Sequence, residues 1–234
     1  MMKHDAPIGI IAAMQLEAEG ILSSMTDITT ETISGIVFSA GRLAGRPLVV
    51  AVCGIGKVFA ALCAQTMILR YQPSLILNTG VAGSLSSALS IGDIAVATAL
   101  VQHDMDTSPL GDPVGWLSGI GLVKLPCEKE ASDRLADCVR SLGIGCCRGV
   151  IASGDVFVSD AGKKRWIAST FDAVACEMEG ASIGQVCYVN GTPCAVMRAI
   201  SDGGDDSAHL DFPAFARLAA DNAVRVILTF FESM

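Results

Sequence analysis

The chain has 234 residues, of which 51% are hydrophobic and 5% aromatic, and its formal net charge is −8. This length suits a single large α/β domain over residues 1–234, with a core of aliphatic side chains such as parallel sheets contain. An acidic chain without a Lys/Arg cluster argues against nucleic acid as a partner, and no apolar run approaches the length that spans a membrane.

The cysteines and the N-terminal residues indicate in which cellular compartment the protein is expected. The nine cysteines are scattered, odd in number and without paired CxxC spacing. They predict buried thiols in a reducing environment and neither disulfides nor metal ligands. Residues 1–7 lack the apolar core and cleavage site of a secretory signal, so a cytoplasmic location is expected.

The first strand is predicted over residues 8–12 and leads into a helix that ends near Met25. Glu17 then lies in the first turn of this helix, just past a strand end. The simplest interpretation is a favourable charge at the N-terminal end of the helix dipole. Residues 32–40 and 47–53 are predicted as two further strands around a hairpin-like turn at 41–46.

A glycine-rich segment, GIGK at 54–57, opens the next predicted helix, which runs to about Tyr71. It is a poor dinucleotide fingerprint because Phe59 replaces the third glycine. Backbone N–H groups at this helix start could still bind an anion or a polar ligand. A buried strand over 74–78 and a glycine-containing turn over 79–83 follow, and residues 91–97 are predicted to continue the sheet.

The segment 103–106, His-Asp-Met-Asp, invites a metal-site interpretation. No further His or Cys cluster completes a coordination shell, so no metal is expected. Residues 114–126 are expected to form a loop, 127–142 a helix and 149–153 a strand that runs toward Phe157. The basic run 163–165 is expected to be a solvated face of a helix.

The densest group of candidate residues lies between Cys176 and Asp202. A strand should end in the acidic box 177–180, a helix should cover about 181–189, and a second strand should begin at 194. Glu179 and Asp202 then follow strand ends, where open α/β sheets bind ligands. A buried acid there could release a proton near neutral pH, and a second carboxylate could accept hydrogen bonds from a ribose diol. The alternative is structural: Glu179 caps a helix and Asp202 starts a loop.

The C-terminal part is predicted to contain a flexible acidic loop at 203–206 and an amphipathic helix at about 213–231. Phe212 is expected to precede that helix, where it could pack as a hydrophobic staple.

Taken together, the motifs resemble those of bacterial 5′-methylthioadenosine/S-adenosylhomocysteine nucleosidases, of the nucleoside phosphorylase superfamily. The similar segments are 9–17, 54–57, 78–83, 92–93, 103–106, 153–157, 178–181 and 198–202. They occur in the family's order over nearly the whole chain, which is more specific than any one motif. The resemblance implies a single three-layer α/β/α domain with a central mixed sheet, a homodimer, and no cofactor.

The resemblance also implies a reaction. The family's enzymes hydrolyse the N-glycosidic bond of 5′-methylthioadenosine and S-adenosylhomocysteine, and we expect 5′-deoxyadenosine to react as well. Adenine and a 5-substituted ribose are the products, which serves methionine salvage and removes by-products of the methyl cycle. Bond breakage through an oxocarbenium-like state requires protonation of the purine. Asp202 is the candidate acid, and Glu17 matches the family's general base that activates water.

Further residues match substrate-binding positions of the family. Glu179 and the Met178 backbone would hold the ribose hydroxyls, Phe157 would stack on the purine, and the Val158 backbone would bond its edge. Arg198 would orient the carboxylates or the water. The remaining candidates are Met14, Ile55 (5′-substituent pocket), Gly83 (ribose and base), Leu110 (supplied to the neighbouring subunit), Ser201 and Phe212 (lid). The chain departs from the family where Gln15 and Leu16 replace frequent acidic residues, where Val81 replaces a frequent serine, and where Leu110 stands in place of a common aromatic residue.

Three alternatives stay open. A phosphorylase would use phosphate in place of water, but the Glu17 carboxylate would repel phosphate. A hydrolase of futalosine-type nucleosides differs only in pocket-wall residues such as Leu110. A nucleoside-binding sensor would have lost catalysis, which the joint presence of Glu17, Glu179 and Asp202 argues against.

Overall fold

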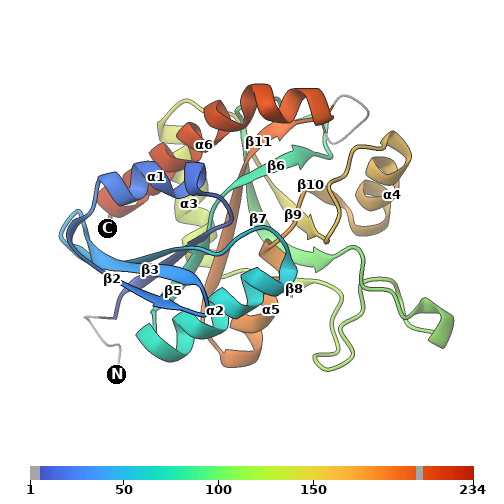
Figure 1. Cartoon of the computed structure of the whole chain (residues 1–234). Helices are drawn as coiled ribbons and strands as arrows, with labels where there is room; N and C mark the ends of the chain where they lie inside the picture. Colours follow the sequence, from blue (N-terminus) through green and yellow to red (C-terminus); the bar gives the residue numbers. More distant parts are fainter. Residues whose placement is uncertain (1–5, 204–207) are drawn as a thin grey trace.

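The computed structural model describes residues 6–203 and 208–234 and has a central sheet with helices on both faces (Figure 1). The strands are β1 (Ile8–Ala12), β2 (Thr26–Ile33), β3 (Ile36–Leu43), β4 (Arg46–Val52), β5 (Leu75–Asn78), β6 (Val81–Ser84), β7 (Ile94–Gln102), β8 (Leu125–Pro126), β9 (Cys146–Ser153), β10 (Ala173–Glu177) and β11 (Cys194–Asp202). The helices are α1 (Gln15–Ser23), α2 (Lys57–Tyr71), the short 3₁₀ helix η1 (Ser108–Leu110), α3 (Lys129–Ser141), α4 (Ala161–Phe171), α5 (Gly180–Asn190) and α6 (Ala208–Glu232).

Strand β11 joins two parts of the sheet. The strand order is β2-β3-β4-β1-β5-β11-β6-β10-β9-β7-β8, with an additional pairing between β11 and β7. The first residues of β11 pair in parallel with β5, and its later residues pair with β6 and β7. Because β6, β10, β9 and β7 also pair in turn, they close a ring with β11. The carboxyl end of β11 therefore lies in a closed, fully buried part of the sheet.

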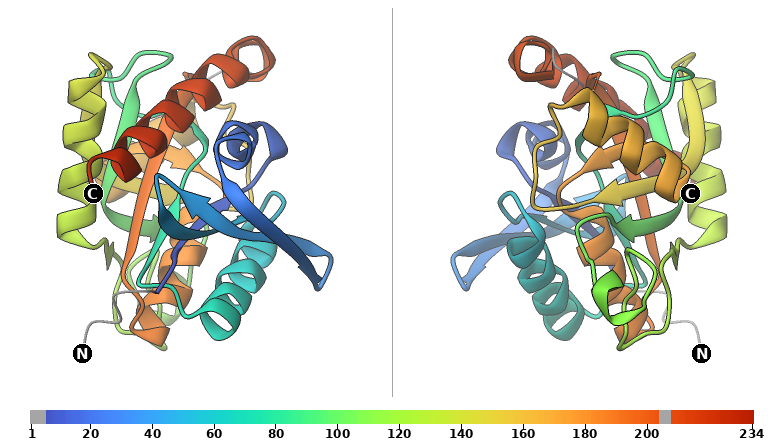
Figure 2. Two further views of the ribbon diagram at one scale, coloured as in Figure 1. Left: turned by 90° about the vertical axis from the view of Figure 1, so that its left-hand side faces the viewer. Right: turned by 90° about the vertical axis from the view of Figure 1, so that its right-hand side faces the viewer.

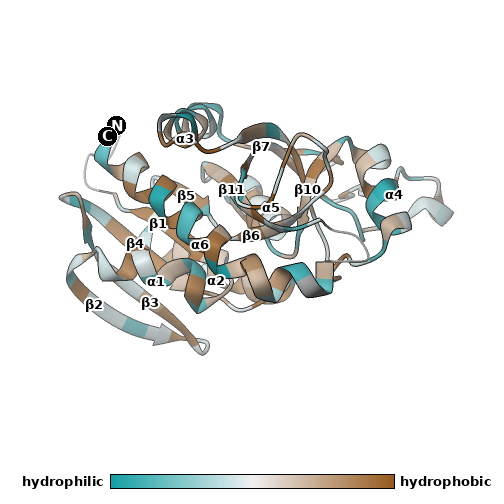
Figure 3. Ribbon diagram, turned by 90° about the horizontal axis from the view of Figure 1, so that it is seen from above, coloured by the Kyte–Doolittle hydropathy of each residue, from teal (hydrophilic) through white to brown (hydrophobic). Residues whose placement is uncertain are grey.

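The helices divide between the two faces of the sheet, as a three-layer arrangement requires. Buried residues of α1, α3 and α6 share one hydrophobic cluster, and those of α2 and α5 share another. Figure 2 shows α6 crossing the sheet on the side of α1 and α3, away from α2 and α5. Brown, hydrophobic colouring prevails in β7 and β10 in Figure 3, whereas α4 carries hydrophilic residues. The predicted α/β/α domain with a central mixed sheet is confirmed.

Several element boundaries differ from the sequence-based expectation. The strand predicted over 32–40 is correct for 36–40, which lie in β3, but its beginning is wrong, because Ser34 and Gly35 have φ of 53° and 78° and reverse the chain between β2 and β3. Such a two-residue turn with positive φ fits the twist of a hairpin. The mainly exposed β2, with its run of threonines, was missed because it has no buried face. The turn predicted over 79–83 is also wrong in part, since Val81 already begins β6.

The C-terminal helix begins earlier than predicted. Phe212 lies within α6 and does not precede it, so the staple interpretation is wrong. In the predicted loop at 203–206, residues 204–206 lie outside the described residues. Lys164, expected on a solvated face, donates a hydrogen bond to the Gly203 carbonyl at 2.6 Å. The nine cysteines are free thiols, and no helix among the described residues is long and apolar enough to cross a membrane.

Candidate active site

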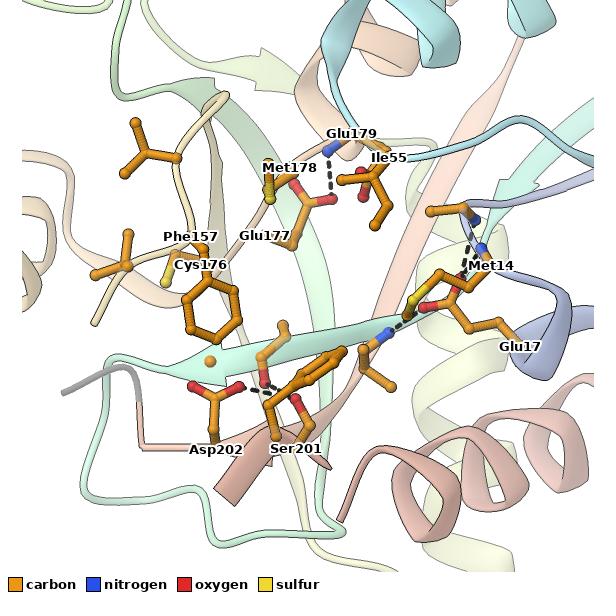
Figure 4. Close-up of a pocket in the computed structure, with 17 residues that line it drawn as sticks. Met14, Glu17, Ile55, Phe157, Cys176, Glu177, Met178, Glu179, Ser201 and Asp202 are labelled. Carbon is orange, nitrogen blue, oxygen red and sulfur yellow. Dashed lines mark hydrogen bonds between the residues drawn. The ribbon is translucent and has the colours of Figure 1, made fainter. Parts of the chain in front are cut away.

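A pocket opens where the ends of β1, β6, β10 and β11 meet α1, the start of α2 and the start of α6 (Figure 4). Carboxylates, aromatic side chains and aliphatic side chains all contribute to its walls. The residues that line it are Ala13, Met14, Glu17, Ile55, Val81, Ala82, Gly83, Val156, Phe157, Val158, Cys176, Glu177, Met178, Glu179, Ser201, Asp202 and Phe212.

Glu17 is fixed by the backbone on one side of the pocket. Its Oε2 accepts hydrogen bonds from the Ala13 and Met14 N–H groups at 2.9 and 2.8 Å, and its Oε1 accepts one from Val81 N–H at 3.0 Å. A Cβ on Gly80 would lie 2.8 Å from Glu17 Oε1, so this close approach requires a glycine. Burial raises the pKa of Glu17, although the Arg198 charge and the backbone bonds oppose the shift. A rigid carboxylate with raised proton affinity suits a general base.

Behind the pocket, Arg198 is the cation of a buried network. It is 1% exposed, and its Nη2 donates to Glu177 Oε2 and, at 2.6 Å, to Asn78 Oδ1. The other side of Glu177 is also occupied, because Ser153 Oγ donates to Oε1. Glu177 Oε2 further accepts the N–H groups of Glu179 and Gly180 at 2.9 and 2.7 Å. Glu177 thus fixes the start of α5 and with it the backbone of Glu179.

This network predicts a large stability effect. Replacing Arg198 by Met leaves Glu177 buried and unpaired, so the free energy of unfolding should fall by about 3–5 kcal/mol. Urea unfolding followed by circular dichroism measures the loss. The double variant Arg198→Met/Glu177→Gln removes the uncompensated charge and should recover part of it. An Arg198→Met protein as stable as the parent would contradict the network.

Glu179 lies between the network and the pocket. Its Oε1 accepts the Gly56 N–H at 2.8 Å, and Arg198 Nη2 is 3.9 Å from its Oε2. Burial, followed by the charge of Glu177, raises the pKa of Glu179 to about 7, and Arg198 opposes the shift. A pocket-lining carboxylate in this position can accept hydrogen bonds from the hydroxyls of a bound diol.

Asp202 forms the opposite wall, at the end of β11. It is 3% exposed, and Ser201 Oγ donates to its Oδ2 at 2.9 Å. In Figure 4 the Phe157 ring lies on the Asp202 side of the pocket, across from Glu17. Phe157 meets Phe212 edge to face, with ring centroids 5.7 Å apart. The pocket therefore offers a carboxyl group and an aromatic face on one side and a buried carboxylate on the other.

The structure brings most of the predicted site residues together. The pocket is lined by both predicted catalytic residues and by these substrate-binding candidates: Met14, Ile55, Gly83, Phe157, Val158, Met178, Glu179, Ser201 and Phe212. Arg198 and Leu110 do not line it. Arg198 contacts the carboxylates from behind, and Leu110 lies on η1 with 83% of its surface exposed.

Sequence reasoning missed Glu177, although it stands in the acidic box two positions before Glu179. Its role depends on Ser153 and Arg198, which are distant in sequence, so only its position at the end of an apolar strand could have signalled it. Cys176, Ala82 and Val156 were also missed as wall residues.

The structure bears on two sequence-based hypotheses: a metal site at 103–106 and an anion site at the start of α2. Among residues 6–203 and 208–234 no cluster of His, Cys, Asp and Glu could hold a metal ion. The Asp104 carboxylate of the His-Asp-Met-Asp segment instead contacts Lys57 Nζ at 2.7 Å. At the start of α2, Glu179 and Asp155 accept the Gly56 and Lys57 N–H groups, so carboxylates of the chain itself occupy this anion-binding position.

Comparison with known proteins identifies relatives of this chain. The family model of the phosphorylase superfamily matches residues 7–232. A 5′-methylthioadenosine/S-adenosylhomocysteine nucleosidase of Shewanella sp. (strain MR-7) is 34% identical over 97% of this chain and 97% of its own. A mutant of the Helicobacter pylori nucleosidase, with 5′-methylthioadenosine in its active site, is 35% identical, with a TM-score of 0.94 over 98% of this chain and 99% of its own. A futalosine hydrolase of Helicobacter pylori gives the same identity, TM-score and coverage.

Proposed function

The chain belongs to the 5′-methylthioadenosine/S-adenosylhomocysteine nucleosidases of the phosphorylase superfamily, and we propose that its pocket hydrolyses the N-glycosidic bond of 5′-methylthioadenosine and S-adenosylhomocysteine. The products are adenine and the 5-substituted ribose. The observation that carries this proposal is the placement of Glu17 and Asp202 on opposite sides of one pocket that Glu179 also lines.

Each group has a defined part in the reaction. With the purine against Phe157, Asp202 donates a proton to a ring nitrogen, so that adenine leaves as a neutral molecule. The Glu179 carboxylate accepts hydrogen bonds from the ribose hydroxyls, and the Met178 backbone N–H donates one to them. As the oxocarbenium-like centre forms, Glu17 takes a proton from the attacking water on the far side. Two carboxyl groups in different surroundings can thus serve as acid and base.

The surroundings of Glu17 support water over phosphate as the nucleophile. The Ala13, Met14 and Val81 N–H groups, which could bind an anion, already bind the Glu17 carboxylate. The helix-start N–H groups of Gly56 and Lys57 are likewise bound to carboxylates. A phosphate in this pocket would meet negative charge where phosphate sites present donors.

Substrate choice within this class is tested by comparing adenine release from 5′-methylthioadenosine, S-adenosylhomocysteine, 5′-deoxyadenosine and a 6-amino analogue of futalosine. We expect comparable kcat/KM for the first two and slower turnover of the last. The similarity to a futalosine hydrolase makes that compound the relevant competitor. Preferential cleavage of the futalosine analogue would replace the substrate assignment but keep the N-ribosyl hydrolase chemistry.

We propose that the active form is a homodimer. Apolar side chains around the start of α2 are exposed: Ile55 (54%) just before the helix, and Val58 (70%), Phe59 (53%) and Leu62 (48%) at helical spacing within it. Ile55 also lines the pocket, so this face is continuous with the pocket wall. A second copy covering the face would remove it from water and bring an exposed Leu110 to the neighbouring pocket.

Disrupting this face should separate the subunits. Val58→Asp places a charge where the partner would pack, so the solution mass should fall from about twice 24.2 kDa to 24.2 kDa. Light scattering after size exclusion measures the mass, and Val37→Asp, which places the same charge at an exposed valine on β3, is the control. A monomeric parent protein would contradict the dimer.

We further place this reaction in the cytoplasm, in methionine salvage and disposal of methyl-cycle by-products. The free thiols suit a reducing compartment. The substrates are sulfur-containing products of reactions that use S-adenosylmethionine.

A further inference from the structure

Lys57, the first residue of α2, contacts segments from distant parts of the chain. Its Nζ donates to Asp104 Oδ1 at 2.7 Å and to Gln102 Oε1 at 3.2 Å, just after β7 and at its end. Its carbonyl accepts the Ser182 hydroxyl of α5 at 2.7 Å. The Lys57 and Asp104 side chains are 20% and 21% exposed, so this ion pair is largely shielded from water. Lys57 is thus fixed between β7 and α5.

Asp155 completes the arrangement from the segment 154–158, which we name the purine loop because it carries Phe157 and Val158. The Asp155 Oδ1 accepts the Lys57 N–H at 2.8 Å, and Asp104 Oδ2 accepts the Asp155 N–H at 2.9 Å. Asp104 therefore holds both the Lys57 side chain and the Asp155 backbone. Burial raises the pKa of Asp104, but the hydrogen bonds from Lys57 and Asp155 outweigh it and the net pKa is lowered. We name these three residues the latch.

The latch joins two walls that contact different parts of a nucleoside. Gly56, next to Lys57, donates its N–H to Glu179, the residue assigned to the ribose. Phe157, two positions after Asp155, is assigned to the purine. Gly56 has φ of 102°, and a Cβ there would lie 3.1 Å from Asp155 Oδ1, so the two segments approach closely. Any movement of the purine loop relative to α2 changes the distance between the two subsites.

We infer that Lys57, Asp104 and Asp155 are positioning residues that set the spacing between the ribose-binding Glu179 and the purine-stacking Phe157. None of them lines the pocket, so they act through the segments that they hold. A nucleoside spans both walls and needs the correct spacing, whereas free adenine would contact Phe157 and Asp202 without reaching the ribose-binding Glu179. The latch therefore matters for ligands that occupy both subsites at once. This inference rests on the proposed function.

Lys57→Met removes the ion pair and keeps the aliphatic stem and the backbone bonds. Because misplacement of a binding wall by about 1 Å can cost up to about 100-fold, we expect kcat/KM for 5′-methylthioadenosine to fall about tenfold or more. The inhibition constant of adenine should change less than twofold. Lys57→Arg, which keeps the charge, should regain most of the activity. Lys129→Met removes a similar but exposed Lys–Asp pair on α3 and is the matched control.

An unchanged kcat/KM in Lys57→Met would overturn the inference. An inhibition constant of adenine that rises by the same factor as kcat/KM falls would overturn it as well. Hydrogen–deuterium exchange provides a test that does not depend on activity. Exchange in segments 54–57 and 154–158 should accelerate together in Lys57→Met but not in Lys129→Met. Unchanged exchange in 154–158 would also overturn the latch. A parent protein that releases no adenine would instead contradict the proposed function, and the exchange result would still decide the latch.

Discussion

Asp202→Asn is expected to stop turnover while nucleoside binding stays within a few-fold of the parent. The amide keeps the size of the side chain and an oxygen for the Ser201 hydroxyl, but it has no acidic proton for the purine. Loss of a general acid costs about 10²–10⁴-fold in rate. Single-turnover kinetics measure the rate, and equilibrium binding of 5′-methylthioadenosine to the variant measures affinity.

An exposed aspartate provides the control for this variant. Asp172, at the C-cap of α4, has φ of 55°, a conformation that asparagine also tolerates. Asp172→Asn should therefore leave kcat and stability unchanged. If Asp202→Asn kept near-parental turnover, the proton would have to come from another group, and the assignment of the acid would be wrong. If the parent bound the nucleoside and showed no turnover, the chain would be a sensor.

Glu17→Gln should produce a comparable loss of kcat, about 10²–10⁴-fold, because a neutral amide cannot take a proton from water. The substitution also disturbs the site. Both carboxylate oxygens accept hydrogen bonds from backbone N–H groups, and the amide nitrogen that replaces one of these oxygens cannot accept them. Glu19→Gln, on the exposed part of the same helix, is the matched control. Glu17→Gln with parental kcat would remove Glu17 from the mechanism.

The same carboxylates determine the pH dependence. Glu17 must be ionised to act as base, and burial raises its pKa. Glu179 accepts the ribose hydroxyls best when ionised, and its pKa is raised to about 7. Both groups gain protons as the pH falls, so kcat/KM should decline below about pH 7. A kcat/KM that instead increases toward pH 5 would contradict these roles.

The parts of the fold that sequence could predict are those fixed by local patterns. Buried runs identified β1 and β5, and glycines marked the start of α2. The ring through β11 could not be predicted, because its pairing with β7 depends on contacts between Met197 and Val96 far apart in the chain. The polar strand β2 has no periodic pattern of apolar residues that could have predicted it. The start of α6 was predicted too late because Pro213 resembles a helix start, whereas the helix already includes Phe212.

The site was predictable to the extent that its residues follow strand ends. Glu17 and Glu179 follow strand ends, Asp202 is the last residue of its strand, and all three meet in one pocket. Whether a charged residue faces the pocket or lies behind it depends on packing, so the sequence left open whether Arg198 would orient the carboxylates or the water, and in the structure it contacts Glu177. Leu110 projects from its own chain, and its part in a neighbouring pocket depends on a contact between copies that a single sequence does not specify.

The central claim is that water, activated by Glu17, attacks the sugar. The most direct measurement is product analysis of the purified protein with 5′-methylthioadenosine, with and without inorganic phosphate, using chromatography to follow adenine and mass spectrometry to identify the sugar. We predict adenine and free 5-methylthioribose at equal rates in both conditions. A phosphate requirement together with a sugar 1-phosphate product would contradict the account and identify a phosphorylase.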